Sequence, residues 1–139
     1  EQLAYVDERG FGRIVIRQAD GTITDLLKKR PEGVSDLHPT WSPDGNVVLF
    51  TRYPTLEKPP YLVAVTLSTT EQQDQSPIYS GPVPMREGKY SPDGLWLVFE
   101  SWAKAGNHEI SIMTTNGSNL RNLTDSPSFD FDPEWRPGN

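Results

Sequence analysis

The most constraining feature of the sequence is a five-residue segment that occurs twice and returns a third time in altered form. Trp41-Ser42-Pro43-Asp44-Gly45 recurs 49 positions later, at residues 90–94, as Tyr-Ser-Pro-Asp-Gly. An altered copy, Trp-Arg-Pro-Gly-Asn at residues 135–139, follows after another 45 positions. Self-similarity at a spacing of about 20 to 50 residues is typical of repeat architectures. We therefore expect repeated structural units.

Segments with the character of β-strands lie between these anchors. Residues 46–51 and 95–100, directly after the first two anchors, are mostly apolar. Residues 109–114 alternate apolar and polar side chains, and Asn116-Gly117 behind them suits a two-residue hairpin turn. Each unit of 45 to 49 residues thus holds about four short strands, which indicates one blade of a β-propeller. No substantial helix is expected, and a β-sandwich is the main alternative fold. The remaining predicted strands are residues 12–17, 22–27, 61–66, 77–80 and 120–124.

The composition agrees with an all-β chain and excludes several functions. The 13 Pro and 11 Gly among 139 residues favour many short strands joined by turns. A net charge of −6 argues against a protein that follows nucleic-acid phosphates, because such a protein needs a basic face. The absence of Cys excludes disulfides and thiolate sites, and no apolar run is long enough to insert into a membrane.

The repeats resemble those of TolB-like β-propellers. "HPTWSPDGNVVLFTRY" is similar to the segment that leads from the innermost strand of a blade to the second strand. "NHEISIMTTNGSNLRNLTDSPSFDFDPEW" is similar to the third and fourth strands and the start of the next unit. The resemblance covers essentially the whole chain. Departures are Tyr90 in place of Trp, Gly88 in place of the preceding Pro, and the missing Asp of the last copy.

The phase of the repeat predicts how the blades are divided. The single propeller segment 1–139 is expected to hold one blade split between residues 1–36 and 129–139, a second at about 37–85, and a third at about 86–128. Residues 2–7 are expected to be a second strand without a first, and "DFDPEWRPGN" a first strand without a second. TolB-like propellers have six blades, so we expect a homodimer that exchanges terminal strands to form one six-bladed ring. The alternative is a half cut from a longer propeller, and the start at Glu1 suggests processing or excision.

Acidic residues recur where innermost strands begin, at the expected mouth of the central channel. This pattern predicts a Ca²⁺ site or a surface for a cationic peptide. The alternative is that these side chains cap local turns, and no other cofactor is expected. The candidate ligands are Asp36, His38, Glu87, Asp130 and Asp132.

No catalytic residue is predicted. The chain has two His, and neither the G-x-S-x-G nor the H-E-x-x-H pattern occurs. His38 and His108 are interpreted as turn or surface residues, and the Asp of each Asp-Gly pair as a turn residue. Three aromatics, Trp41, Tyr90 and Trp135, are expected to pack between blades, and Trp96 within the core. Trp102, at a strand end, is the candidate anchor for a partner.

Three functions remain open from the sequence. The resemblance implies a non-enzymatic scaffold that binds a protein or peptide, without nucleic acid or membrane insertion. It also implies a bacterial protein in the periplasm or another extracytoplasmic compartment. The alternatives are a propeller fragment of a larger enzyme, a peptidase or a polysaccharide-active one, and a metal- or ligand-sensing module. Fold by itself does not decide among them.

Overall fold

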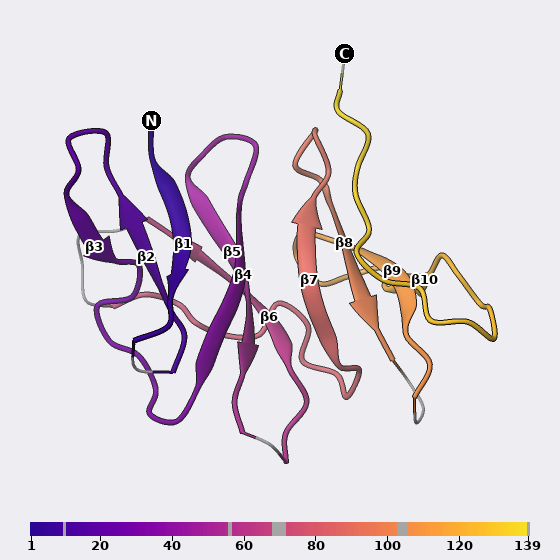
Figure 1. Ribbon diagram of the computed structural model, residues 1–139. Coiled ribbons are helices and arrows are strands. Elements are labelled where there is room, and N and C mark those ends of the chain that lie inside the picture. The colour runs from indigo at the N-terminus through magenta and orange to yellow at the C-terminus, as the bar shows by residue number, and fades with distance from the viewer. Residues whose placement is uncertain (10, 56, 68–71, 103–105, 139) are drawn as a thin grey trace.

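Three antiparallel sheets stand side by side and form the described part of the chain (Figure 1). The computed structural model describes residues 1–9, 11–55, 57–67, 72–102 and 106–138. Within these ranges the chain is all-β, as predicted, and contains no helix. Consequently, no described helix is long and apolar enough to cross a membrane. Blade 1 consists of β1 (Leu3–Asp7), β2 (Arg13–Arg17) and β3 (Ile23–Asp25); blade 2 of β4 (Ser35–Trp41), β5 (Val47–Tyr53) and β6 (Tyr61–Thr66); blade 3 of β7 (Met85–Tyr90), β8 (Trp96–Ser101), β9 (Glu109–Thr114) and β10 (Arg121–Asn122).

The repeated Ser-Pro-Asp-Gly segment is the turn that joins the first and second strands of blades 2 and 3. The amide of Gly45 donates to the carbonyl of Ser42 over 2.9 Å, and Gly45 has a φ of 74°. Pro is favoured at the second position of such a turn because its φ is already fixed. Asp44 Oδ1 accepts bonds from the Ser42 hydroxyl at 2.6 Å and from the amide of Asn46 at 3.0 Å. Residues 91–95 repeat the arrangement, so these Asp side chains have the structural role that the sequence predicts.

The core lies between blades. One cluster joins Ile14 and Ile16 of blade 1 to Val48 and Phe50 of blade 2. The other joins Leu49 of blade 2 to residues of blade 3. Neighbouring side chains of β5 thus enter different cores, because side chains alternate across a strand. Trp41 packs against the first cluster and Tyr90 against the second, which confirms their predicted packing.

The outer strands are shorter than the sequence predicts. Strand β3 covers three residues and β10 two, whereas strands were expected over 22–27 and 120–124. Residues 77–80 form no strand, and the amide of Ile78 donates to the carbonyl of Leu62 in blade 2 over 3.0 Å. Propensity marked these outer segments as strands, but strand assignment also requires a continuous ladder of hydrogen bonds to a neighbour.

The turn at Asn116-Gly117 differs from the expected two-residue hairpin turn. The amide of Gly117 donates to the carbonyl of Thr114 over 2.9 Å, and Thr114 in turn donates from its amide to Ser118. Gly117 has a φ of 83°, and an added Cβ would lie 2.1 Å from the carbonyl oxygen of Ile78. The glycine is therefore required both for its backbone conformation and for the close approach of the segment that follows blade 2.

Replacing Gly117 by Ala should destabilise the fold more than replacing Gly21. Gly21 has a similar φ, 89°, but its Cβ would meet nothing within 4 Å. Gly21→Ala should therefore cost only the left-handed conformation, about 1–2 kcal/mol. Gly117→Ala adds the contact with a backbone oxygen, and we expect a further loss of at least about 1 kcal/mol. Urea denaturation measures both free energies of unfolding; equal losses would contradict the close approach.

Candidate functional site

Three segments that lead into the repeated aromatic share one unusual backbone conformation. His38 in β4, Glu87 in β7 and Asp132 in the C-terminal segment have φ angles of 54°, 55° and 55°. Each residue stands three positions before Trp41, Tyr90 or Trp135. In β4 and β7 the pairing register shifts at this point, so the residue lies in a β-bulge. Non-glycine residues rarely adopt such φ values, and they are enriched at functional sites.

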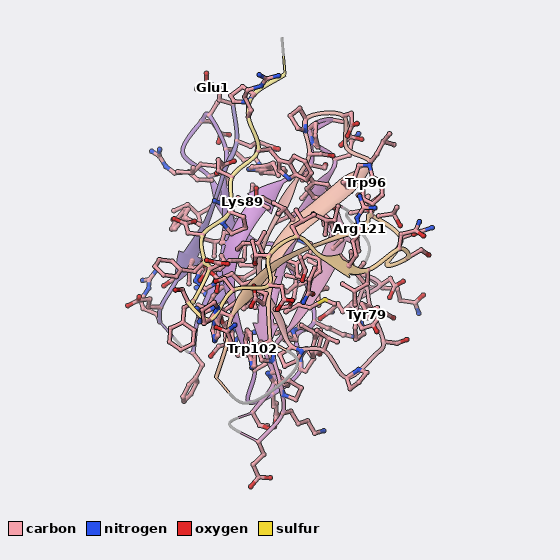
Figure 2. All side chains as sticks on the ribbon, turned by 90° about the vertical axis from the view of Figure 1, so that its right-hand side faces the viewer. Glu1, Tyr79, Lys89, Trp96, Trp102 and Arg121 are labelled. Carbon is pink, nitrogen blue, oxygen red and sulfur yellow. The ribbon has the colours of Figure 1, made fainter. Side chains whose placement is uncertain are left out.

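The three positive-φ residues line one hollow of about 330 Å³. His38 Nε2 lies 3.6 Å from Glu87 Oε1, which links β4 to β7. Lys89 Nζ lies 3.1 Å from Asp132 Oδ1 and 2.8 Å from Glu134 Oε2, which links β7 to the C-terminal segment. Figure 2 shows Lys89 beside the yellow C-terminal ribbon. The hollow is therefore a charged surface shared by three successive innermost segments.

Lys89 carries the positive charge of this surface. Partial burial opposes the charge of its ammonium group, but hydrogen bonds to Glu134 and Asp132 outweigh that effect and raise the pKa of Lys89. The two carboxylates are 72% and 71% exposed, so the ion pairs contribute little to stability. These ion pairs therefore affect the arrangement of charge at the surface more than the stability of the fold.

The predicted metal ligands do not converge. Asp36 is 1% exposed and accepts two bonds from Arg52, at 2.7 and 2.9 Å. Asp130 Oδ2 accepts a bond of 3.4 Å from the hydroxyl of Ser126. His38, Glu87 and Asp132 are in the hollow, paired as described above. Among the residues that the structure describes, no three His, Cys, Asp or Glu side chains could hold a metal ion together. Ca²⁺ binding stays a prediction that this geometry does not support.

Aromatic rings gather at the end of blade 3 where β8 ends. The ring of Trp102 stacks on that of His108, with centroids 4.5 Å apart and planes 5° from parallel. Phe129 meets His108 edge-on at 5.7 Å, and the guanidinium of Arg86 lies 5.8 Å from the Trp102 ring. Trp102 is half-buried, and His108, which the sequence analysis interprets as a turn or surface residue, lies outside any strand and is partly exposed while its ring packs in the cluster. A role of Trp102 in binding a partner stays a prediction.

Glu100 connects this aromatic cluster to the hollow, and the sequence analysis missed it. Its side chain is 1% exposed and accepts bonds from Arg86 Nε at 2.7 Å and from the amide of Asp132 at 2.9 Å. His108 Nδ1 lies 3.4 Å from the same carboxylate. A charged residue at the end of an otherwise apolar strand run was the available signal, because a carboxylate is rarely buried without cationic partners.

Trp96 and Trp135 lie on the outward side of blade 3. Trp96 was expected in the core, but it is half-buried and the guanidinium of Arg121 lies 5.6 Å from its ring (Figure 2). The indole nitrogen of Trp135 donates to the carbonyl of Lys89 over 3.1 Å. The C-terminal segment is thus held against blade 3 by side-chain contacts.

Comparisons with known proteins agree with this architecture. No family model matches the chain. The Tol-Pal system protein TolB of Anaeromyxobacter dehalogenans is 29% identical over 132 residues, 91% of this chain and 27% of that protein. A solved structure of a TolB-type protein from Agrobacterium tumefaciens superposes with a TM-score of 0.71 and 20% identity, covering 88% of this chain and 45% of that one. TolB from Acinetobacter baumannii superposes with a TM-score of 0.69 and 13% identity, covering 94% and 31%.

The chain is a relative of the TolB-like β-propellers. The uncharacterized peptidase YuxL of Bacillus subtilis is also similar, with 30% identity over 105 residues, 75% of this chain and 16% of that protein. The chain spans 16% and 27% of the lengths of these two sequence relatives.

Replacing Glu100 by Gln should destabilise the chain at neutral pH. Burial raises the pKa of Glu100, but the bonds from Asp132 and Arg86 outweigh it and hold the pKa below its ordinary value of 4.5. A lowered pKa means that the stabilisation is present above that value and is lost as the pH falls through the folded-state pKa. Losing the charge should cost about 2 kcal/mol at pH 7.

Urea denaturation at neutral and at acidic pH measures this effect. The stability gap between the wild type and Glu100→Gln should close as the pH falls below 4.5, the ordinary value. Glu134→Gln is the matched control, because that carboxylate is 72% exposed and should change stability little. A gap that does not depend on pH would contradict the assigned role of the Glu100 charge.

Proposed function

We propose that the chain supplies three blades of a non-enzymatic, six-bladed propeller that binds a protein or peptide partner outside the cytoplasm. The relation to Tol-Pal system proteins supports this function, because it extends over 91% of the chain. The observation that carries the proposal is the hollow, in which three successive segments present polar or charged side chains from residues of nearly equal positive φ. A rigid frame with variable side chains is what a recognition surface needs.

The hollow suits the polar groups of an extended peptide. It offers a cation at Lys89 and carboxylates at Glu87, Asp132 and Glu134, all within the same surface. Each of these groups lies 2.8 to 3.6 Å from another side chain of the hollow, so a partner would meet charges of both signs close together. Complementary charges across an interface favour specificity and correct orientation of the partner.

The face of blade 1 that points away from blade 2 supports completion of the ring. Ala4 packs toward blade 2, so its neighbours Leu3 and Tyr5 face the opposite side. Leu3 and Ile23 both align with Arg17 across the sheet and are 57% and 53% exposed. In blade 2, by contrast, Val48 and Phe50 face the preceding blade and are buried completely. Blade 1 thus exposes a surface of the kind that another blade covers.

The C-terminal segment supports the same conclusion at the other end. Asp132 has the same positive φ as His38 in β4 and Glu87 in β7, although the structure assigns residues 130–138 no strand. In blade 1, β1 is the edge strand of its sheet and pairs with β2. In blades 2 and 3, β5 and β8 pair at the corresponding edge with the preceding strands, β4 and β7. The segment therefore has the backbone of an innermost strand, and β1 has the free edge that such a strand pairs with.

We infer that a second copy of the chain provides the pairing strand. Blade 2 and blade 3 separate β1 from the C-terminal segment of the same chain (Figure 1). Two copies arranged head to tail would place each C-terminal segment beside the partner's first blade and give six blades. The single chain covers 45% of the TolB-type chain from Agrobacterium tumefaciens, in keeping with half a ring.

Light scattering coupled to size-exclusion chromatography tests the ring. The chain should elute as a dimer, and deletion of residues 130–139 should yield monomers. Glu134→Gln, which keeps the segment, should remain dimeric. A monomeric wild type at micromolar concentration would overturn ring closure by a second copy, without bearing on partner binding.

Selection from a random peptide library tests the binding surface. Peptides enriched on the wild-type chain should lose about tenfold or more in affinity when Lys89 is replaced by Met, because a charged contact is removed. Arg17→Gln, which changes a cation outside the hollow, should bind them normally. Failure to enrich any peptide, or equal binding to both variants, would contradict the proposed surface.

A propeller fragment of a peptidase is the second candidate function. The similarity to the peptidase YuxL favours it, at 30% identity over 105 residues. The matched part is 16% of that protein, so this candidate requires a catalytic domain elsewhere in a longer polypeptide. The genomic sequence that flanks the coding region of this chain would decide between the two candidates.

A further inference from the structure

We infer that two copies of the chain join through one specific surface, in which Trp135 lies opposite the partner's Leu3 and Leu123 packs in a core shared with that residue. The inference rests on the ring of the proposed function and assigns the residues that close it. It follows from contacts that recur at the two boundaries between blades within the chain and are half complete at its two ends.

The C-terminal segment already occupies the place of the first strand of a further blade. Near the start of β4, the amide of Asp36 donates to the carbonyl of Gly12, just before β2, over 3.0 Å. The start of β7 makes the same bond to blade 2. At the end of blade 3 the amide of Asp130 donates to the carbonyl of His108 over 2.9 Å. Residues 130–138 therefore contact blade 3 as β4 contacts blade 1, and no strand of the described chain pairs with them.

The two ends of the chain expose the two halves of one core between blades. Leu26 and Leu123 are equivalent, because each donates its amide to the second residue of the neighbouring strand, β2 or β9, over 2.9 and 2.7 Å. Leu26 packs in the cluster with blade 2 and is 3% exposed, whereas Leu123 is 54% exposed. On the other side of that cluster, Val48 is completely buried, whereas Leu3 is exposed. Another copy of blade 1 placed beside blade 3 would cover both leucines.

Strand β1 corresponds in register to β5, the second strand of blade 2. Val6 pairs with the second residue of β2, and Thr51 pairs with the second residue of β6. Counting back three residues along each strand makes Leu3 the equivalent of Val48. The packing agrees, because Ala4 packs toward the blade that follows, as the residue after Val48 does.

This correspondence fixes which residues of the two copies face each other. The aromatic residue that ends β4 lies opposite Val48, so Trp135 lies opposite the partner's Leu3. By the same pairing one residue further on, Glu134 lies opposite the partner's Ala4. Because the C-terminal segment forms one side of the hollow, the partner's β1 completes the support of that side.

Opposite charges meet at this surface. Residues 130–134 contain three acids and no basic residue, whereas residues 9–17 of blade 1 contain three Arg and no acid. In the same register Asp130 lies beside the partner's Asp7, whose carboxylate is 2.8 Å from the 88% exposed Arg9. An acidic segment that joins an arginine-rich blade favours association in the correct orientation.

Disulfide formation between introduced cysteines tests the register, because the chain contains no Cys. Ala4→Cys combined with Glu134→Cys places two thiols directly opposite each other, at a Cα separation that a disulfide spans. Oxidation should convert this variant to a covalent dimer in non-reducing electrophoresis. The matched control combines Glu134→Cys with Val6→Cys, a diagonal pair about 7–8 Å apart that a disulfide does not bridge. It should run as a monomer.

Replacing Leu123 by Ala tests the shared core. The dissociation constant of the dimer, measured by analytical ultracentrifugation, should rise about tenfold or more, because less apolar area is buried. Leu95→Ala is the matched control, since Leu95 is 61% exposed in the turn before β8 and lies outside the proposed surface. It should dimerise like the wild type.

The outcomes separate this surface from the proposed function. A dimeric wild type in which the 4/134 pair cross-links no better than the 6/134 pair would overturn the register and leave the ring in place. Equal dissociation constants of the wild type and Leu123→Ala would likewise overturn the shared core alone. A monomeric wild type would overturn both the surface and the ring. The measurement on Leu123→Ala decides the matter if a double-cysteine variant fails to fold.

Discussion

Burial of β5 on both faces is the constraint on which the rest of the structure depends. A single blade has no interior of its own, because its sheet is one layer thick. Its apolar side chains are buried only where they pack against a neighbouring blade. Val48 and Phe50 use blade 1 for this purpose, and Leu49 uses blade 3. The stability of the chain consequently comes from contacts between blades. The outward faces of blades 1 and 3 would need a further layer to bury apolar side chains in the same way.

Ion pairs with a buried carboxylate hold the first and second strands together at the end where the innermost strands begin. Asp36 pairs with Arg52 in blade 2, and Arg86 pairs with Glu100 in blade 3. Removing one partner of such a pair is costly because the other charge then stays buried and uncompensated. Glu100 extends this role to the next segment by accepting the amide of Asp132, so one carboxylate positions both blade 3 and the C-terminal segment.

The sequence predicted the repeating parts of the structure well and the single contacts poorly. Ser42, Asp44 and Gly45 form a turn from local chemistry alone, so their pattern was sufficient to predict it. The positions of Trp41 and Tyr90 followed from the period. The burial of Glu100 and the stacking of Trp102 on His108 depend on segments distant in the chain, and no spacing within one repeat encodes them.

The acidic candidates illustrate the same division. The recurrence of acidic residues before the repeated aromatics was visible, but the sequence could not distinguish a side chain that enters a blade from one that lines the hollow. Asp36 enters and binds Arg52, whereas Glu87 and Asp132 line the hollow. The difference follows from the place in the repeat, because Asp36 stands two residues before the positive-φ position that Glu87 and Asp132 occupy.

The positive φ shared by the three positions also separates variation of the charged surface from variation of the fold. One backbone conformation accepts His38, Glu87 and Asp132, which differ in size and charge, at equivalent places. Substitutions there can change the charge of the hollow while the turns and the cores between blades stay as they are. Each blade can therefore alter its own part of this surface, with each position varied independently of its equivalents.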